Sequence, residues 1–442
     1  MNLRAPITTP TYASVPFKRW MYVIPVAVVM YMLAYLDRNN VAVILQYVSK
    51  DMPLSNSAKG TATGIFFIGY MFLQIPGAIL AARWSARKTV FILMIAWGLA
   101  AMACGLVQTE TQLYVARFFL GVFEGGVWPA VLILIASWFP QVERAQANAL
   151  WMVCLPLSNM LMAPLTGVLL TDLSWRTVFV IEGIPPLLWA IVWWFAVADR
   201  PGQAKWLSRA EREYVESALV EENAGKPADV SYKSALRDRR VLLLIGAYFC
   251  WMTGFYGFSL WLPGVVKSIT HNGTATMVGW LSAIPYTVAM VAMLANAAWS
   301  DNTGNRRLAV ALPLSLGAGF LLLGQFVSGA GAQMLVLCGA AACVFAPYGP
   351  FWAIPGQKLR LEVVAVAMGL INAIGNLGGF LGPYLVGWIS EGKDVSFAAF
   401  AVLAAFLVGA VVITLLLPRE PREPAGADGL RVEPAGSLTG RE

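Results

Sequence analysis

Four charged residues lie inside long apolar runs of the sequence, where ionised side chains are costly. Asp37 and Arg38 belong to the first run, and Arg117 and Glu124 belong to the fourth. At membrane depth each such group costs at least about 2.5 kcal/mol by insertion scales, so it is a functional candidate. An arginine offers a planar fork of donors that matches a carboxylate, and acidic side chains bind and release protons. These residues predict an anion site at Arg38 and proton sites at Asp37 and Glu124.

The spacing of these residues relates their depths. A rise of about 1.5 Å per residue puts Asp37 roughly 22 Å into the first run and Arg117 about 8 Å into the fourth, which enters from the other side. Both then lie at nearly the same height in a core of roughly 30 Å, with Glu124 a further ~10 Å down. A buried structural ion pair between Asp37 and Arg117 is the alternative interpretation, because buried charges are usually paired. A structural pair of this kind accounts less readily for Arg38 and Glu124.

Polar and aromatic residues near these positions complete a candidate pocket. Tyr35 lies one helical turn before the arginine of the first run, and Tyr70 and Gln74 share a face of the second. Asn372 and Asn376 are one turn apart in the eleventh run, where amides could bind hydroxyl groups. The alternative is that these side chains form interhelical hydrogen bonds or line the membrane interface.

No pattern in the sequence predicts a metal centre or an enzyme active site. The only histidine is His271, and no CxxC pair or GxSxG motif occurs. We therefore expect no metal or organic cofactor, with protons as the coupling ion. The cysteines, all in apolar runs, are expected to be reduced packing residues: Cys104, Cys154, Cys250, Cys338 and Cys343.

The composition indicates that most of the chain lies in a membrane. Of 442 residues, 58% are apolar and 12% charged, whereas soluble proteins average about 25% charged residues. Of the 31 basic and 24 acidic residues, 26 lie in 199–240 and 418–442. This distribution argues against a soluble enzyme, a disordered chain and a disulfide-rich secreted domain.

Twelve apolar runs are long enough to cross a bilayer. A helix needs about 20 apolar residues for this, and the runs are too long and continuous for barrel strands. The predicted transmembrane helices are 20–47, 58–83, 88–107, 111–138, 145–171, 175–198, 241–267, 274–299, 308–328, 332–356, 363–389 and 396–417.

The central charged segment divides these helices into six and six. We expect an N-terminal bundle at 1–198, a linker at 199–240 with an amphipathic helix at the membrane surface, a C-terminal bundle at 241–417 and a disordered tail at 418–442. With both termini cytoplasmic, the inner segments hold 24 of the 31 Lys and Arg and the outer loops hold five, as the positive-inside rule requires. The net charge of +7 follows from this bias, so we expect no nucleic-acid partner.

Motifs in order along the chain resemble those of the anion:cation symporter family of the major facilitator superfamily. They are Tyr35-Leu36-Asp37-Arg38-Asn39-Asn40-Val41, Arg117 to Gly126, Trp175-Arg176, Ile181-Glu182-Gly183, Ser300 to Arg307, and Asn372 to Pro383. The resemblance implies an all-α membrane protein with twelve transmembrane helices in two pseudo-symmetric six-helix bundles.

The resemblance also implies roles for particular residues. In that family the first-span acid and the fourth-span glutamate carry protons and the first-span arginine holds the substrate carboxylate, which maps to Asp37, Glu124 and Arg38. Arg117 is then a supporting charge. From its place near the start of its span, Glu182 is expected to be structural. The remaining pocket residues are Tyr35, Tyr70, Asn372 and Asn376.

One loop motif departs from the family pattern. The family's gating motif maps to Arg83 and Arg87 in the first half and to Asp301 and Arg306 in the second. The acid usual in the first copy is replaced by Ala82, and the usual glycine by Ser85. The acidic contact of that motif is therefore missing or supplied elsewhere, which affects the balance between inward- and outward-facing states.

These features predict a monomeric, multi-pass inner-membrane symporter that imports a small organic acid with protons by alternating access. The carrier alternatives are a proton-coupled exporter of drugs or metabolites and an organic anion exchanger. A membrane enzyme or sensor on the same bundle is a further alternative, and neither a nucleophile motif nor a signalling domain supports it.

Overall fold

The computed structural model describes residues 18–48, 52–223, 236–271, 273–358, 361–392 and 397–418. It contains twelve helical spans that are long and apolar enough to cross a membrane. The span ends lie within a few residues of those predicted from the apolar runs, so the twelve-helix prediction is confirmed. The tail predicted at 418–442 and the middle of the linker fall outside the described residues, apart from Pro418 in the tail.

The N-terminal bundle contains the first six spans. They are α1 (Lys18–Ile44), α2 (Asn56–Arg83), α3 (Ala86–Leu106), α4 (Glu110–Gly125) with α5 (Val127–Trp138), α6 (Gln141–Met152) with α7 (Cys154–Asp172), and α8 (Trp175–Glu182) with α9 (Ile184–Ala196). At several helix starts a polar side chain accepts a hydrogen bond from a free backbone N–H group, as at Ser55, Ser85, Thr109 and Ser174.

The C-terminal bundle contains the other six. They are α12 (Arg239–Ile269), α13 (Ala275–Thr303), α14 (Arg306–Leu323), α15 (Ala330–Phe345) with α16 (Tyr348–Lys358), α17 (Leu361–Gly375) with α18 (Gly378–Ile389), and α19 (Phe397–Leu416). Several spans are therefore broken near mid-length, and the breaks at Gly126 and Gly183 are the two that bear on the site.

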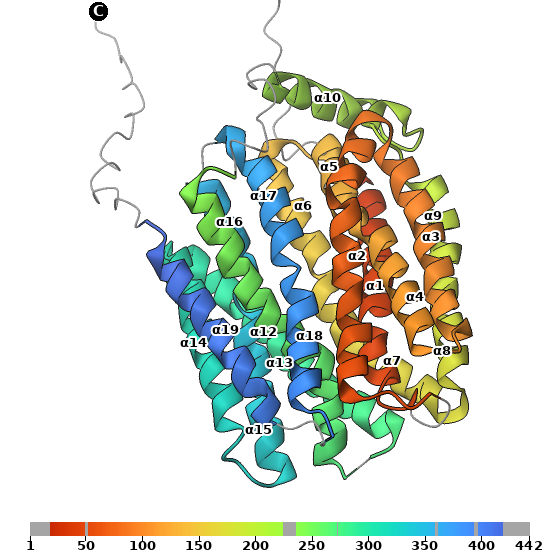
Figure 1. Cartoon of the computed structure of the whole chain (residues 1–442). Coiled ribbons are helices and arrows are strands. Elements are labelled where there is room, and N and C mark those ends of the chain that lie inside the picture. Colours follow the sequence, from red (N-terminus) through yellow and green to blue (C-terminus); the bar gives the residue numbers. More distant parts are fainter. Residues whose placement is uncertain are drawn as a thin grey trace, which may run out of the picture.

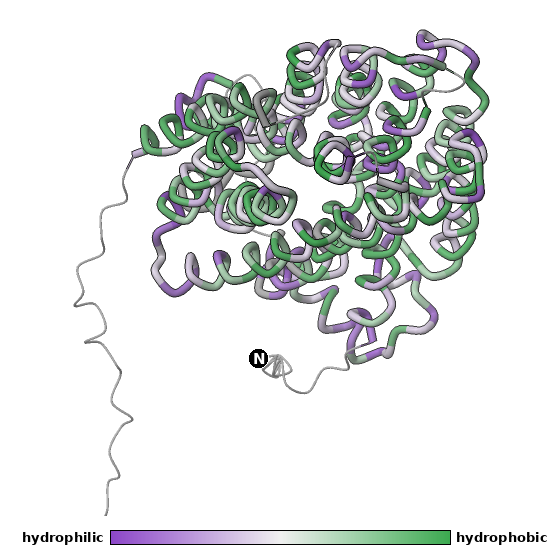
Figure 2. The backbone as a smooth tube through the Cα atoms, turned by 90° about the horizontal axis from the view of Figure 1, so that it is seen from below, coloured by the Kyte–Doolittle hydropathy of each residue, from purple (hydrophilic) through white to green (hydrophobic). Residues whose placement is uncertain are grey.

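Both bundles present apolar side chains outward. Seen along the helices, the molecule shows hydrophobic residues around its circumference (Figure 2). Large apolar side chains such as Phe195 and Phe326 are more than four-fifths exposed in the absence of lipid. This surface suits a hydrocarbon environment.

The linker helix α10 (Arg209–Asn223) lies across the end of the N-terminal bundle where α1 begins (Figure 1). The last residues of α19 lie at the same end of the molecule. We call this end the linker face and the other end the opposite face.

The two bundles pack closely near the opposite face. α2 lies against α18, where the backbone carbonyl of Pro383 would be 2.6 Å from a Cβ at Gly60. α7 lies against α13, where Ala275 O would be 2.5 Å from a Cβ at Gly167. Only residues without a side chain permit such approaches, so glycine positions set this contact.

Candidate functional site

Arg38 and Glu124 form a buried ion pair at the centre of the N-terminal bundle. The Arg38 guanidinium donates to Glu124 Oε2 from Nη2 at 3.0 Å and from Nε at 3.3 Å. Arg38 is 3% exposed and Glu124 is 1% exposed. Glu124 Oε1 has no hydrogen-bond partner, so one acceptor of the pair is unused.

Aromatic rings surround the guanidinium of Arg38. Its central carbon lies 4.6 Å from the ring centroid of Tyr35, 4.7 Å from that of Tyr70 and 5.2 Å from that of Phe66. At such distances the ring faces attract a cation. The structure thus brings Tyr35 and Tyr70 to Arg38 as the sequence predicted, and their part in binding a substrate stays a prediction.

The close approach of α2 and α4 sets the positions of these groups. A Cβ on Gly121 would lie 1.9 Å from Phe66 O, and one on Gly125 would lie 2.1 Å from Tyr70 O. The α4 backbone therefore touches α2 at the residues that cover Arg38. Glu124, between these glycines, is held at the height of the guanidinium.

Asp37 and Arg117 do not form the ion pair that the structural alternative required. Arg117 donates instead to the backbone carbonyls of Asp37 at 3.1 Å and Arg38 at 3.2 Å. The Asp37 carboxyl accepts from Trp97 Nε1 at 3.1 Å, and its Oδ1 has no partner. Adjacent positions on a helix point about 100° apart, so Asp37 faces α3 while Arg38 faces α4. Arg117 holds the α1 backbone, which suits the supporting charge predicted for it.

The two predicted amides lie between the bundles. Asn372 on α17 donates to Gln74 Oε1 on α2 at 3.0 Å, and Asn376 donates to the Asn372 carbonyl at 2.7 Å and to its side-chain oxygen at 2.9 Å. In this state Asn372 makes an interhelical hydrogen bond, as the alternative interpretation expected, whereas both hydrogen bonds of Asn376 stay within its own span. Gln74 Nε2 is buried without a partner, so one donor remains beside them.

Sequence reasoning missed several aromatic residues at the site. Tyr31 lies one turn before Tyr35 on α1, and its ring contacts Trp128 at 5.3 Å and Trp151 at 5.1 Å between centroids. Tyr256 contributes from the other bundle, its ring 4.2 Å from that of Phe67. Helical spacing from Tyr35 could have identified Tyr31, whereas the contact of Tyr256 depends on how the bundles meet.

Asp199 supplies the acid that the first loop motif lacks. Its Oδ2 accepts from Ser85 Oγ at 2.6 Å, and its Oδ1 accepts from the backbone N–H of Arg87 at 2.9 Å. The Arg87 side chain donates to Trp194 O and stacks on that ring at 4.3 Å. The motif is thus anchored to the end of α9.

In the second copy of the motif, Arg306 pairs with Asp301 at 2.5 Å and donates to Ser300 Oγ at 2.9 Å. Gly304 adopts the left-handed backbone conformation (φ 65°) that ends α13. Arg83 is exposed at the end of α2. These contacts of Arg87 and Arg306 stay within their own bundles in this state. The gating role of all four motif residues stays a prediction.

A second buried charge cluster fixes the linker helix to the N-terminal bundle. Arg19 on α1 pairs with Glu143 on α6 at 2.5 Å and approaches Glu211 on α10 at 3.8 Å. Tyr214 donates to Glu143 Oε1 at 3.0 Å. Desolvation raises the pKa of Glu211. The sequence alone does not indicate this cluster, because the return of α10 to α1 is a tertiary contact. Contact of α10 with lipid stays a prediction.

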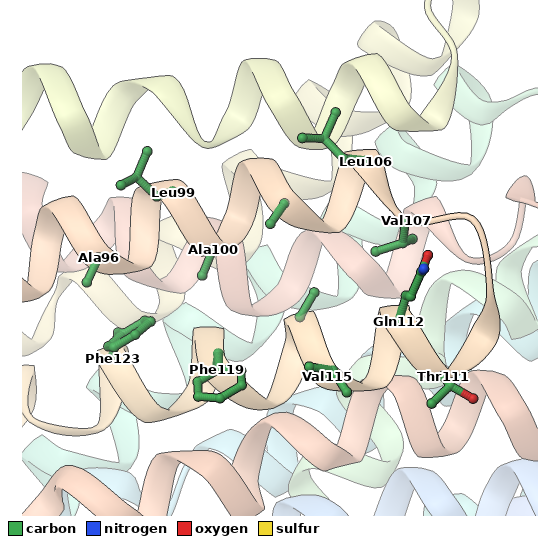
Figure 3. Close-up of a pocket in the computed structure, with 12 residues that line it drawn as sticks. Ala96, Leu99, Ala100, Leu106, Val107, Thr111, Gln112, Val115, Phe119 and Phe123 are labelled. Carbon is green, nitrogen blue, oxygen red and sulfur yellow. The ribbon is translucent and has the colours of Figure 1, made fainter.

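A groove of about 780 Å³ opens on the outer side of α3 and α4 (Figure 3). Its lining is mostly apolar, and Leu99, Leu106, Val115 and Phe119 on it are exposed. These side chains face the hydrocarbon region and cannot pair with a carboxylate, so the groove is not the predicted anion site.

Two helical bundles around buried ionisable groups, in a chain with twelve spans, define a multi-pass membrane transporter rather than an enzyme. The chain belongs to the Major Facilitator Superfamily, whose family description matches residues 27–383 and 266–440.

Among the proteins similar to this chain are two bacterial transporters. One from Agrobacterium vitis, whose name assigns it to tartrate transport, is 32% identical over 423 residues and covers 93% of both chains. A quinolone resistance transporter from Acinetobacter baumannii is 31% identical over 402 residues, covering 89% of this chain and 92% of its own.

A bacterial homologue of the human lysosomal transporter Spinster has a similar solved structure, with a TM-score of 0.69. It is 18% identical and covers 91% of this chain and 96% of its own. This likeness supports the fold.

Proposed function

We propose that this protein imports a small organic carboxylate together with protons by alternating access. The observation that carries the proposal is the Arg38–Glu124 pair inside a cage of aromatic rings. A guanidinium there matches a carboxylate ligand, and that of Arg38 already binds the carboxylate of Glu124. The similarity to a relative named for tartrate transport supports an organic acid as substrate.

The same geometry suggests how proton and anion binding are coupled. A substrate carboxylate must compete with Glu124 for Arg38. When Glu124 takes up a proton it no longer neutralises the guanidinium, so the guanidinium is free to bind the substrate. The proton on Glu124 then balances the negative charge of the substrate carboxylate, so the buried site stays neutral. Asp37, with an unpartnered Oδ1, is the second candidate proton carrier.

The orientation follows from charge. We assign the linker face to the cytoplasm and the protein to an inner membrane, because the predicted inner segments carry most of the Lys and Arg residues. The carrier functions as a monomer with no bound cofactor. Import then requires the contact at the opposite face to open and close in each cycle.

Substitution of Glu124 by Gln tests the coupling. A thermal-shift screen of carboxylic acids first selects the ligand, since a true ligand stabilises the folded protein. In proteoliposomes, Glu124→Gln should lose accumulation of that acid driven by a pH gradient, because the amide cannot be protonated, and should retain exchange of labelled acid across the membrane. Glu213→Gln, on the exposed side of α10, is the matched control and should behave as the wild type.

Proton-driven accumulation at the wild-type level in Glu124→Gln would refute the assignment of Glu124. Exchange without accumulation in the wild type would indicate an anion exchanger instead.

Export of drugs is the second candidate function, because a relative at 31% identity is named for quinolone resistance. Inverted vesicles that accumulate a fluoroquinolone when acidified inside, and proteoliposomes that take up no carboxylate, would favour it.

A further inference from the structure

A third carboxyl group, that of Glu182, is buried in the N-terminal bundle and has no part in the mechanism above. It is the last residue of α8, at the break before Gly183, and is 3% exposed. Its Oε2 accepts from Asn40 Nδ2 at 2.8 Å, and its Oε1 accepts from Thr166 Oγ1 at 2.6 Å. Both partners are neutral.

Within the part of the chain that the structure describes, this carboxyl has no cationic partner. Among the described residues, no Lys or Arg nitrogen lies within ion-pair distance of Glu182, and α3 faces the break after it with Gly98 and Met102. Asp37 of α1, a group of the same sign, lies close enough to interact with it. A buried carboxylate held by dipoles alone is costly to keep ionised, so its charge state depends on local hydration.

The charges in the centre of the bundle give the same indication. Two guanidinium groups, of Arg38 and Arg117, face three carboxyl groups, of Asp37, Glu124 and Glu182. With every group ionised the centre would be negative by one charge. One proton in total restores neutrality, and Asp37 and Glu182, which form no ion pair among the described residues, are the carboxyl groups available to hold it.

The Asn40 side chain can pair with Glu182 in either charge state. Its Nδ2 donates to an ionised carboxyl, and its own Oδ1 is buried without a partner. A protonated carboxyl would donate to that oxygen after the amide turned over, since an amide carries both donor and acceptor. The hydrogen bond between Asn40 and Glu182 is therefore kept when Glu182 is protonated, with donor and acceptor exchanged.

Glu182 also joins the substrate-binding helix to the contact between the bundles. Asn40 lies two residues after Arg38 on α1. Thr166 precedes Gly167, the α7 residue that packs against Ala275 of α13. A change in the charge of Glu182 therefore acts on α1 close to Arg38 and on α7 at its contact with α13.

We propose that Glu182 is a third proton-binding carboxyl of this protein and positions α1 relative to α7 through Asn40 and Thr166. The proton comes from water and returns to it when the bundle opens, and no other bond is made or broken. The inference rests on the proposed function for its role in transport, but not for the protonation itself.

Infrared difference spectroscopy tests the protonation without a substrate. The full-length protein in lipid is compared in acidic and alkaline buffer. The wild type should show a carbonyl-stretch band of a protonated carboxyl that Glu182→Gln lacks, and Glu213→Gln should keep it. Thr166→Val, which removes one hydrogen bond, should shift the frequency of the band; this variant decides the question if Glu182→Gln does not fold. Identical spectra for the wild type and either Glu182→Gln or Thr166→Val would overturn the proposal.

Transport measurements test the consequence. At equilibrium each co-transported proton multiplies accumulation about tenfold per unit of pH gradient, so Glu182→Gln should accumulate about tenfold less acid per unit. Its exchange rate should stay within about threefold, because the amide keeps both hydrogen bonds. Glu182→Asp, which retains a titrating group, should restore the wild-type pH profile. Unchanged accumulation in Glu182→Gln would contradict the role in coupling, whereas failure of the wild type to accumulate any acid would count against the proposed function and leave the infrared result decisive for Glu182.

Discussion

At the scale of single residues, Arg38 pairs with Glu124, whereas Asp37 and Arg117 do not pair with each other. Four ionisable groups in apolar runs were identified because each is costly there, and all are buried together. The pairing partner of Arg38 depends on side-chain direction and on the α2–α4 distance. Neither can be obtained from depth alone, so the alternative pair of Asp37 with Arg117 was wrong.

Arg38→Lys should weaken anion binding by about tenfold or more, equivalent to about 1.4 kcal/mol. A lysine keeps the charge but loses the planar fork and the stacking between Tyr35 and Tyr70. Calorimetric titration of the purified variant with the acid found by the thermal-shift screen measures this. Arg209→Lys, on an exposed part of α10, is the control for the same chemical change. Equal affinities in Arg38→Lys and the wild type would exclude a direct contact between Arg38 and the anion.

At the scale of helices, the span ends were predictable because bilayer thickness and the helical rise fix the length of each apolar run. The breaks at Gly126 and Gly183 were not predicted, since a glycine within an apolar run is also compatible with a continuous helix. The break at Gly183 places Glu182 at a helix end inside the bundle, whereas the sequence predicts a structural residue near the start of its span.

Gly121→Ala should destabilise the protein by about 1–3 kcal/mol, because the added methyl group meets the backbone of α2. Separation of α2 from α4 should also weaken the Arg38–Glu124 pair. Gly319→Ala on α14, where a Cβ meets nothing within 4 Å, is the matched control and should not lower stability. Thermal unfolding in detergent compares the two. A melting temperature in Gly121→Ala equal to that of the control would show that the helices adapt without cost.

At the scale of the whole molecule, two bundles meet near the opposite face along α2–α18 and α7–α13. The six-plus-six arrangement was predictable from the central charged segment. Which face of the molecule is closed could not be predicted from the sequence. The two access states of such a carrier have the same sequence and differ only in which ends of the helices touch.

A pair of cysteines across this contact should lock it. Thr171 Oγ1 and Thr276 Oγ1 lie 2.6 Å apart on α7 and α13, so cysteines at both positions can form a disulfide. Oxidation of Thr171→Cys/Thr276→Cys should stop transport in proteoliposomes and a reductant should restore it, because the opposite face can no longer open. The single variants, treated in the same way, control for the native cysteines. Transport by the oxidised pair at the wild-type rate would mean that the cycle does not require this face to separate.

The ion pair at the centre of the site bears on the unloaded half of the cycle. A carrier that returned empty with a bare guanidinium would move an unscreened charge through a low-dielectric region, at considerable electrostatic cost. Glu124 acts as a resident counter-ion for Arg38 and removes that cost. In the proposed import cycle, self-neutralisation of this kind would permit the vacant protein to reorient on its own, which would favour net uptake over obligatory one-for-one exchange of solutes.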